Sequence, residues 1–216
     1  MGNLCSCMGG GSAECDFHAM QPKLESLQAT HLSAASQKGV NAFNVSENSL
    51  QTLPEGISAL KNLTVLNVCV NQLTGLPESL GNLVNLTILD ANDNKISKLP
   101  ESIGKLIKLK QFFLFKNECT VLPESMGKLQ ALQELNAFNN KLIKLPVGLG
   151  QLASLQELNV ADNKLKTTPS FDGLTSLTRL ALFSNNLVVL PAIKGLQKVT
   201  KIELYRNALE TLPEFG

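Results

Sequence analysis

The first seven residues, MGNLCSC, carry the clearest covalent chemistry in the chain. Gly2 and Ser6 fit the M-G-x-x-x-[ST] pattern of N-myristoylation, in which the glycine amine accepts an acyl chain once the initiator methionine is removed. One myristoyl chain binds membranes only marginally, so stable anchoring needs a second signal. The first 22 residues contain no Lys or Arg. The pattern therefore predicts palmitoylation at Cys5 and Cys7 as the second signal.

The same segment also allows a metal-binding interpretation. Thiolate and imidazole groups of the kind that zinc prefers occur at four positions, Cys5, Cys7, Cys15 and His18. Their spacing, C-x-C-x7-C-x2-H, is not a usual zinc spacing, and glycines at 9–11 interrupt it. We favour the acylated tail, in which these glycines form a flexible spacer, and predict no metal site.

Catalytic constellations are not found in the sequence. Both histidines, His18 and His31, precede the repeated region, and the serine-hydrolase elbow, the P-loop and the zinc-protease motif do not occur. Asp90 and Asp93 lie close together but have no obvious third partner. The sequence predicts a non-enzymatic protein without a cofactor.

Composition limits the class further. The 216 residues are 44% apolar and include 19 basic and 18 acidic side chains. This balance argues against nucleic-acid binding, which usually requires a basic excess. No apolar run is long enough for a membrane-spanning helix, and no secretory signal is recognised. The five cysteines form no evident disulfide framework, so we expect a reducing compartment: the cytoplasm, with the chain peripheral on the cytoplasmic side of a membrane.

An asparagine that recurs every 22 or 23 residues determines the architecture. The shared frame is L-x-x-L-x-L-x-x-N-x-L-x-x-L-P, as in residues 86–100 and 132–146. Alternating apolar positions predict short strands with one buried side, stacked in parallel. An asparagine amide both donates and accepts, so we expect a ladder of bonds to the backbone of its own and the neighbouring coil. The predicted ladder residues are Asn48, Asn71, Asn94, Asn117, Asn140, Asn163, Asn185 and Asn207.

The segments between the strands predict the outer wall. A proline follows each strand, and an apolar pair such as Ile103 and Leu106 comes after it, which suits a short inward-facing helix. Helices are wider than strands, so the stack should curve with the sheet on its concave face. The copy around Thr168 and Phe171 is one residue short, and we expect a tighter, less helical segment there.

The two ends differ. Residues 23–39 place Leu24, Leu27, Leu32 and Ala35 on one helical face, which predicts an N-terminal capping helix. The eighth copy reaches Phe215 with no capping segment, so this end is a candidate surface for self-association. The predicted organisation is a flexible lipid-anchor tail at 1–22, the capping helix at 23–39 and eight repeats at 40–216.

The strand phase also predicts which side chains face the hollow of the sheet. Clustered exposed aromatics mark interaction sites, and aromatic and Arg residues dominate interface energies. An aromatic centre with a charged rim is the anatomy of a protein-binding surface. The alternative is that the aromatics only pack on each other across strands. The predicted partner-binding residues are Phe113, Phe115, Phe138, Phe183, Tyr205, Arg179, Lys201 and Arg206.

The motifs LPESLGNLVNLTIL (76–89) and LPESIGKLIKLKQF (99–112) resemble the leucine-rich-repeat family, and within it the 23-residue class of intracellular Ras-group and Shoc-2-like proteins. The resemblance covers residues 40–216. It implies an α/β solenoid, a horseshoe with the parallel sheet inside and short helices outside. It further implies a scaffold or adaptor whose partner is a small GTPase, a kinase or a phosphatase complex. The alternative is a structural component of a cytoskeletal or ciliary assembly.

Overall fold

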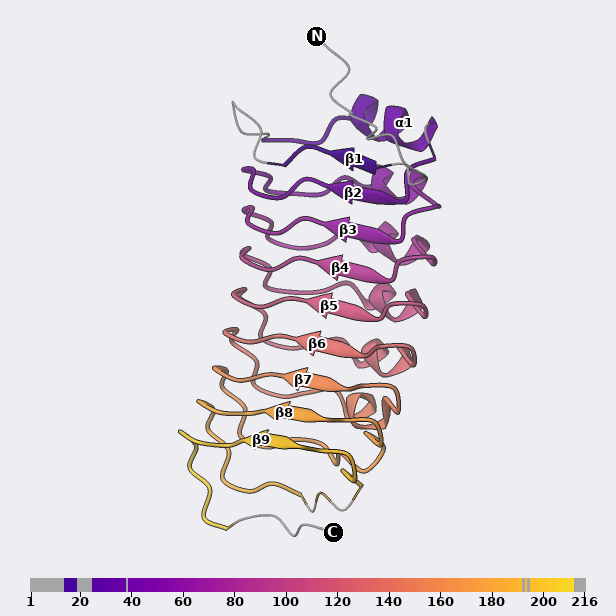
Figure 1. Cartoon of the computed structure of the whole chain (residues 1–216). Helices are drawn as coiled ribbons and strands as arrows, with labels where there is room; N and C mark the ends of the chain where they lie inside the picture. The colour runs from indigo at the N-terminus through magenta and orange to yellow at the C-terminus, as the bar shows by residue number, and fades with distance from the viewer. Residues whose placement is uncertain (1–13, 19–24, 38, 192, 194, 212–216) are drawn as a thin grey trace.

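The computed structural model describes residues 14–18, 25–37, 39–191, 193 and 195–211. One parallel sheet of nine strands runs the length of the molecule, and the strands follow one another in chain order (Figure 1). The strands are β1 (Glu14–Asp16), β2 (Ala42–Asn44), β3 (Val65–Asn67), β4 (Ile88–Asp90), β5 (Gln111–Phe113), β6 (Glu134–Asn136), β7 (Glu157–Asn159), β8 (Arg179–Ala181) and β9 (Lys201–Glu203). The predicted solenoid of stacked strands is confirmed.

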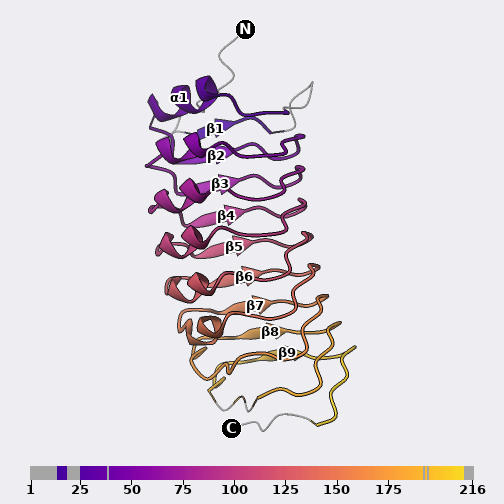
Figure 2. The same ribbon diagram turned by 180° about the vertical axis from the view of Figure 1, so that it is seen from behind.

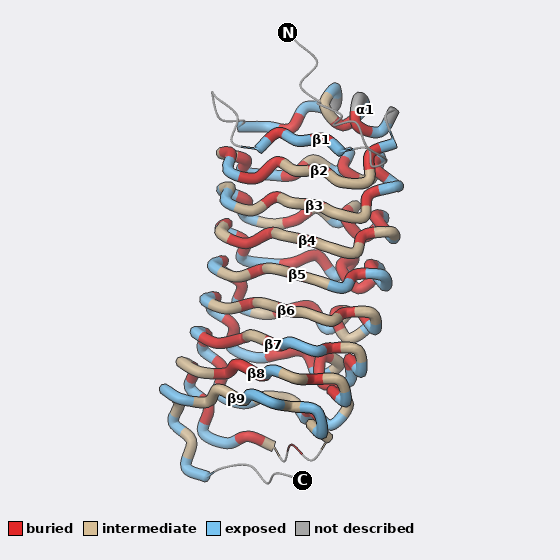
Figure 3. Tube along the Cα trace, in the orientation of Figure 1, coloured by how far each residue is buried: buried red, intermediate tan, exposed pale blue. Residues whose placement is uncertain are grey.

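Each strand has three residues, and its middle side chain points into the core. In β4, Leu89 is fully buried, whereas Ile88 and Asp90 keep partial exposure on the outer face of the sheet. The register follows the repeat, because Leu89 pairs with Phe112, which lies 23 residues further along. Figure 3 shows the result as partly exposed strands in front of a buried interior. The predicted phase therefore holds.

The outer wall consists of short 3-10 helices, which Figure 2 shows from behind. They are η1 (Glu55–Ala59), η2 (Glu78–Asn82), η3 (Glu101–Lys105), η4 (Glu124–Lys128) and η5 (Val147–Gln151). A proline with φ between −60° and −73° precedes each one, so the ring sets the chain direction at the start of the turn. Five residues leave room for little more than one turn, which favours the tighter helix. Residues 169–174 form no helix, and Phe171 is buried there.

The N-terminal end is covered by a helix and by an additional strand. Helix α1 (Ala29–Gln37) lies within the predicted 23–39 segment and buries Leu32 and Ala35. The structure differs from the predicted flexible tail at residues 14–18, because β1 pairs with β2 in parallel. Cys15 and Phe17 alternate with polar neighbours and are 1% and 3% exposed, so burial of these two side chains holds the strand on the sheet.

The far end of the sheet is less completely buried. Ile202, Leu204 and Leu209 around β9 are only partly buried and pack against the core. Residues 212–216 lie outside the described residues, so the predicted self-association surface stays a prediction. Within the described ranges, no helix has the length and apolarity that crossing a bilayer demands.

Candidate functional site

The asparagine ladder fixes the strands that carry the candidate site. The Asn140 side-chain oxygen accepts from the Cys119 N–H at 3.0 Å, and its amide nitrogen donates to the Leu114 and Ala137 carbonyls at 3.0 and 3.2 Å. The same pattern recurs from Asn71 to Asn207. The first ladder residue, Asn48, donates to the Phe17 carbonyl at 2.8 Å and so connects the ladder to the N-terminal strand segment.

A second polar row lies on the outer face of the sheet, four residues before the ladder. The side-chain oxygens of Asn44, Asn67, Asp90, Asn136 and Asn159 each accept from the backbone N–H two residues further on, at 3.0–3.2 Å. Each bond closes an Asx turn, which fixes the orientation of the side chain through its oxygen atom. Where the residue is Asn, the amide N–H groups remain available on the concave face. These bonds to the chain itself were not identified from the sequence.

Aromatic rings form a contiguous row on the C-terminal part of the concave face. The Phe138 and Phe183 ring centroids are 6.2 Å apart at an interplanar angle of 45°. The next pair, Phe183 and Tyr205, is stacked at 4.6 Å and 7°. Between Phe138 and Phe183, the row passes over Ala161, which is fully buried. Tyr205 is 54% exposed, and the other rings are half-buried.

The remaining predicted aromatics, Phe113 and Phe115, lie on the β5 copy and are half-buried on the same face. The ring contacts within the described chain link Phe138, Phe183 and Tyr205, and neither β5 ring is among them. The cross-strand packing that the sequence allowed therefore joins rings of the β6, β8 and β9 copies.

The predicted basic rim is largely neutralised by one carboxylate that sequence reasoning missed. Glu203 contacts the Arg179 guanidinium at 3.1 Å and the Lys201 ammonium at 3.1 Å. The hydrogen bond from Lys201, with Arg179 nearby, holds the pKa of Glu203 below its ordinary value. Arg206 is exposed and precedes the ladder asparagine in a left-handed turn, at φ 56°.

A hollow of about 130 Å³ opens on the concave face beside the aromatic row. All of its lining residues belong to strands β6, β7 and β8. The lining residues are Glu134, Leu135, Asn136, Glu157, Leu158, Asn159 and Arg179. This hollow and the aromatic row together form the candidate site, which we call the concave site.

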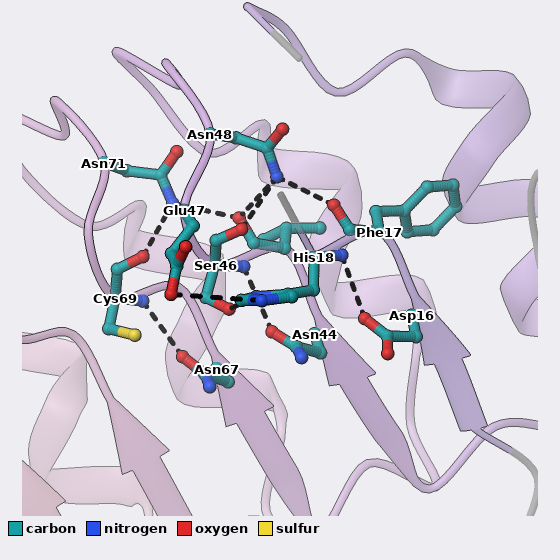
Figure 4. Close-up of polar contacts among 11 residues, drawn as sticks. Asp16, Phe17, His18, Asn44, Ser46, Glu47, Asn48, Asn67, Cys69 and Asn71 are labelled. Carbon is teal, nitrogen blue, oxygen red and sulfur yellow. Dashed lines mark hydrogen bonds and ion pairs between the residues drawn. The ribbon is translucent and has the colours of Figure 1, made fainter. Parts of the chain in front are cut away.

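The N-terminal part of the concave face is polar rather than aromatic (Figure 4). His18 Nδ1 lies 2.8 Å from the Ser46 hydroxyl, and Nε2 lies 3.9 Å from the Glu47 carboxylate. Nothing in the sequence indicates that His18 meets Ser46 and Glu47, which lie 28 and 29 residues further along. Ser46 is 3% exposed, so its hydroxyl is shielded from solvent and offers no accessible nucleophile. Its contact with His18 instead fixes the segment that follows β1 against the β2 copy.

The cysteines differ in state. Cys15 is disulfide-bonded, whereas Cys69 and Cys119 are free. The disulfide is at odds with the predicted reduced set, and it removes Cys15 from the alternative zinc site. Burial, with Asp90 nearby, raises the pKa of Cys69 to about 11, and burial alone raises that of Cys119 to about 12. Gly2, Cys5 and Cys7 lie outside the described residues.

Comparisons with known proteins agree with the geometry. A family model described as a leucine-rich repeat region matches residues 55–142. A leucine-rich-repeat protein of Leptospira interrogans has 30% identity and a TM-score of 0.82, over 93% of this chain and 50% of its own. The leucine-rich effector YopM of Yersinia pestis has 28% identity and a TM-score of 0.68, over 82% and 46%.

A third similar structure is the leucine-rich-repeat ectodomain of the Arabidopsis thaliana receptor kinase GASSHO1/SCHENGEN3, with 28% identity and a TM-score of 0.62, over 85% of this chain and 26% of that one. No curated protein matches significantly. The chain spans half or less of the length of these three structures. It has the leucine-rich-repeat fold, and the matches support the leucine-rich-repeat family, whose fold generally mediates protein–protein interaction.

Proposed function

We propose that the chain is a non-enzymatic scaffold or adaptor that binds a protein partner in the concave site. The observation that carries the proposal is the contiguous ring row of Phe138, Phe183 and Tyr205 on the outer face of the sheet. On β6 and β8 the core is already filled by Leu135 and Leu180, which are 0% and 1% exposed, so the Phe138 and Phe183 rings are not needed to complete it. Aromatic clusters at a surface contribute most of the free energy of protein association.

Two further observations support this proposal. The hollow beside the rings supplies polar groups at the edge of an apolar patch, as protein interfaces do. The Arabidopsis ectodomain was solved in complex with CASPARIAN STRIP INTEGRITY FACTOR 2, so a similar solenoid holds a factor. Within the family, we propose the 23-residue intracellular class, with a small GTPase, kinase or phosphatase complex as the partner.

The test is affinity capture with matched variants. We expect the double variant Phe138→Ala/Phe183→Ala to lose at least about 90% of its specifically captured protein, because interface anchors typically contribute more than about 2 kcal/mol each. The control is Val84→Ala/Ile107→Ala, which removes two apolar side chains that are 48% and 60% exposed outside the concave rows. Unchanged capture by the Phe variant, at an unfolding midpoint close to the control's, would overturn the proposal.

We also propose that the scaffold is held on the cytoplasmic side of a membrane by acyl chains on Gly2, Cys5 and Cys7. The support is the MGNLCSC motif and the need for two acyl chains when no polybasic segment is present. Membrane confinement would raise the effective concentration of the binder for partners at that surface. The disulfide at Cys15 argues against a cytoplasmic location, because disulfides persist mainly in oxidising compartments.

Metabolic labelling decides between the two compartments. Wild type should incorporate an alkyne-tagged myristate that Gly2→Ala does not, and Cys5→Ser/Cys7→Ser should shift the protein from the membrane fraction to the soluble fraction. A wild type that stays unlabelled and is recovered with Cys15 oxidised would refute the acyl anchor. Capture through the concave site would be unaffected, so the two proposals fail separately.

A further inference from the structure

The charges of the concave site are unevenly compensated. Glu134 on β6 and Glu157 on β7 are register partners, so two carboxylates lie side by side in the row that begins each strand. Like charges directly opposite one another destabilise a sheet. Within the described part of the chain, no ion pair involves either carboxylate. The two glutamates thus place an uncompensated negative charge at the hollow.

The neighbouring strands could have neutralised this pair but do not. On β5, Gln111 donates a neutral hydrogen bond to Glu134 Oε2 at 2.8 Å. On β8, Arg179 is the register partner of Glu157, yet its guanidinium bonds to Glu203 at 3.1 and 3.3 Å. Glu203 also holds Lys201 at 3.1 Å, so one carboxylate engages two cations while two carboxylates engage none.

Distances along the strands indicate the form of the occupant. The acidic row and the aromatic row are four residues apart, as Glu134 and Phe138 are, which corresponds to at most about 13 Å at 3.3 Å per residue. Between them lie Asn136 and Asn159, which line the hollow and whose side-chain oxygens accept backbone N–H bonds, so their amide N–H groups remain as donors. An extended chain presents backbone carbonyls to such donors and spans the same distance in four residues.

We propose that the concave face over β6–β9 binds an extended peptide segment that carries an arginine or lysine about four residues from an aromatic or aliphatic side chain. The cationic side chain enters the hollow and pairs with Glu134 and Glu157, the segment's carbonyls accept from Asn136 and Asn159, and its apolar side chain lies on the ring row. The inference rests on the proposed function and specifies its ligand by charge complementarity. An acidic segment is excluded, because it would meet the same two carboxylates unpaired.

Selection from a random 12-residue peptide display library on the immobilised protein tests this. We expect peptides enriched on wild type to carry Arg or Lys about four positions from an aromatic or aliphatic residue. On Glu134→Gln/Glu157→Gln, the basic enrichment should vanish while the apolar enrichment persists. The charge-matched control is Glu101→Gln/Glu210→Gln, which removes two exposed carboxylates outside the concave rows. The control should select the same peptides as wild type.

The best peptide should then bind Glu134→Gln/Glu157→Gln about tenfold or more weakly than the control, with an affinity that falls as salt rises. The variant should unfold no earlier than wild type, because it removes a like-charge contact. If the enriched peptides depend on Phe138 and Phe183 but lack basic residues, the proposal of a cationic ligand is wrong and the proposed function still stands. Selection that yields no peptide sensitive to Phe138→Ala/Phe183→Ala would count against the proposed function as well.

Discussion

The ring of Tyr205 lies parallel to that of Phe183, with centroids 4.6 Å apart and 7° between the planes. Phe183 also meets Phe138, so it is the middle ring of three. Replacing Phe183 with Ala removes both contacts but opens no cavity in the core. We expect a loss of unfolding free energy of about 1–3 kcal/mol, because two aromatic pairs are lost and each contributes about 0.5–1.5 kcal/mol.

The same experiment separates the two faces of a strand. Phe112 and Phe113 are sequence neighbours, yet Phe112 has no exposed area and Phe113 is half-buried on the concave face. Phe112→Ala should cost about 3–5 kcal/mol through cavity formation, and Phe113→Ala should cost much less. Urea unfolding measures all three variants. Equal losses for Phe112→Ala and Phe183→Ala would mean that the ring row belongs to the core.

The ladder predicts a gradient of stability. Asn140 is 8% exposed and its side chain bonds to four backbone groups, so Asn140→Ala leaves buried donors and acceptors unpaired. We expect a loss of about 1–3 kcal/mol. Asn207 makes similar bonds at the less buried end of the sheet, where water can replace them, and Asn207→Ala should cost less. Equal costs in chemical denaturation would show that burial does not set the ladder's contribution.

Much of this architecture follows from sequence spacing alone. Alternation around Leu89 gives the strand phase, and an amide at a recurring turn has few uses other than bonding to backbone. Strand β1 escaped prediction because the stretch around Cys15 lacks the Leu and Asn frame, and its burial depends on tertiary contacts, such as the 5.7 Å approach of Phe17 to Phe43.

The candidate site could be predicted as rows but not as pairs. The sequence places Arg179 and Lys201 on the concave face, whereas their common attraction to Glu203 depends on side-chain distances between neighbouring strands. The Glu157 carboxylate likewise lacks an ion pair because the Arg179 side chain bonds to Glu203 instead. Residue type and period decide which face a side chain occupies, and rotamers decide which partner it takes.

Close packing of the outer turns gives a third prediction. A Cβ added at Gly104 would lie 2.5 Å from the Ser125 carbonyl oxygen and 2.7 Å from the Ser125 Cβ, because η3 and η4 approach closely there. Gly104→Ala must push the two turns apart, and we expect a loss of about 1–3 kcal/mol. The control is Gly75→Ala, whose added Cβ would lie 3.7 Å from the Lys98 oxygen. Similar unfolding midpoints for the two variants would contradict the close approach.

Asp90 occupies the strand position that holds Asn in the β2, β3, β6 and β7 copies. Burial raises the pKa of its carboxyl group, Asp93 adds to the effect, and hydrogen bonds from Asn92 oppose it. An asparagine would keep the oxygen that accepts from the Asn92 N–H at 3.1 Å, as Asn136 does for Phe138. Asp90→Asn should therefore preserve the turn, remove a partly buried charge and raise the melting temperature at pH 7.

The pH dependence of that gain identifies its cause. Because the folded pKa lies above the unfolded value, ionised Asp90 destabilises the wild type at neutral pH, and the penalty is relieved as the pH falls through the folded pKa. The advantage of Asp90→Asn should be full at pH 7 and disappear by about pH 3.9, the ordinary Asp value. Asp162→Asn, at an exposed carboxylate, serves as the control. Calorimetric scans that show the same gain at both pH values would assign it to packing rather than to charge.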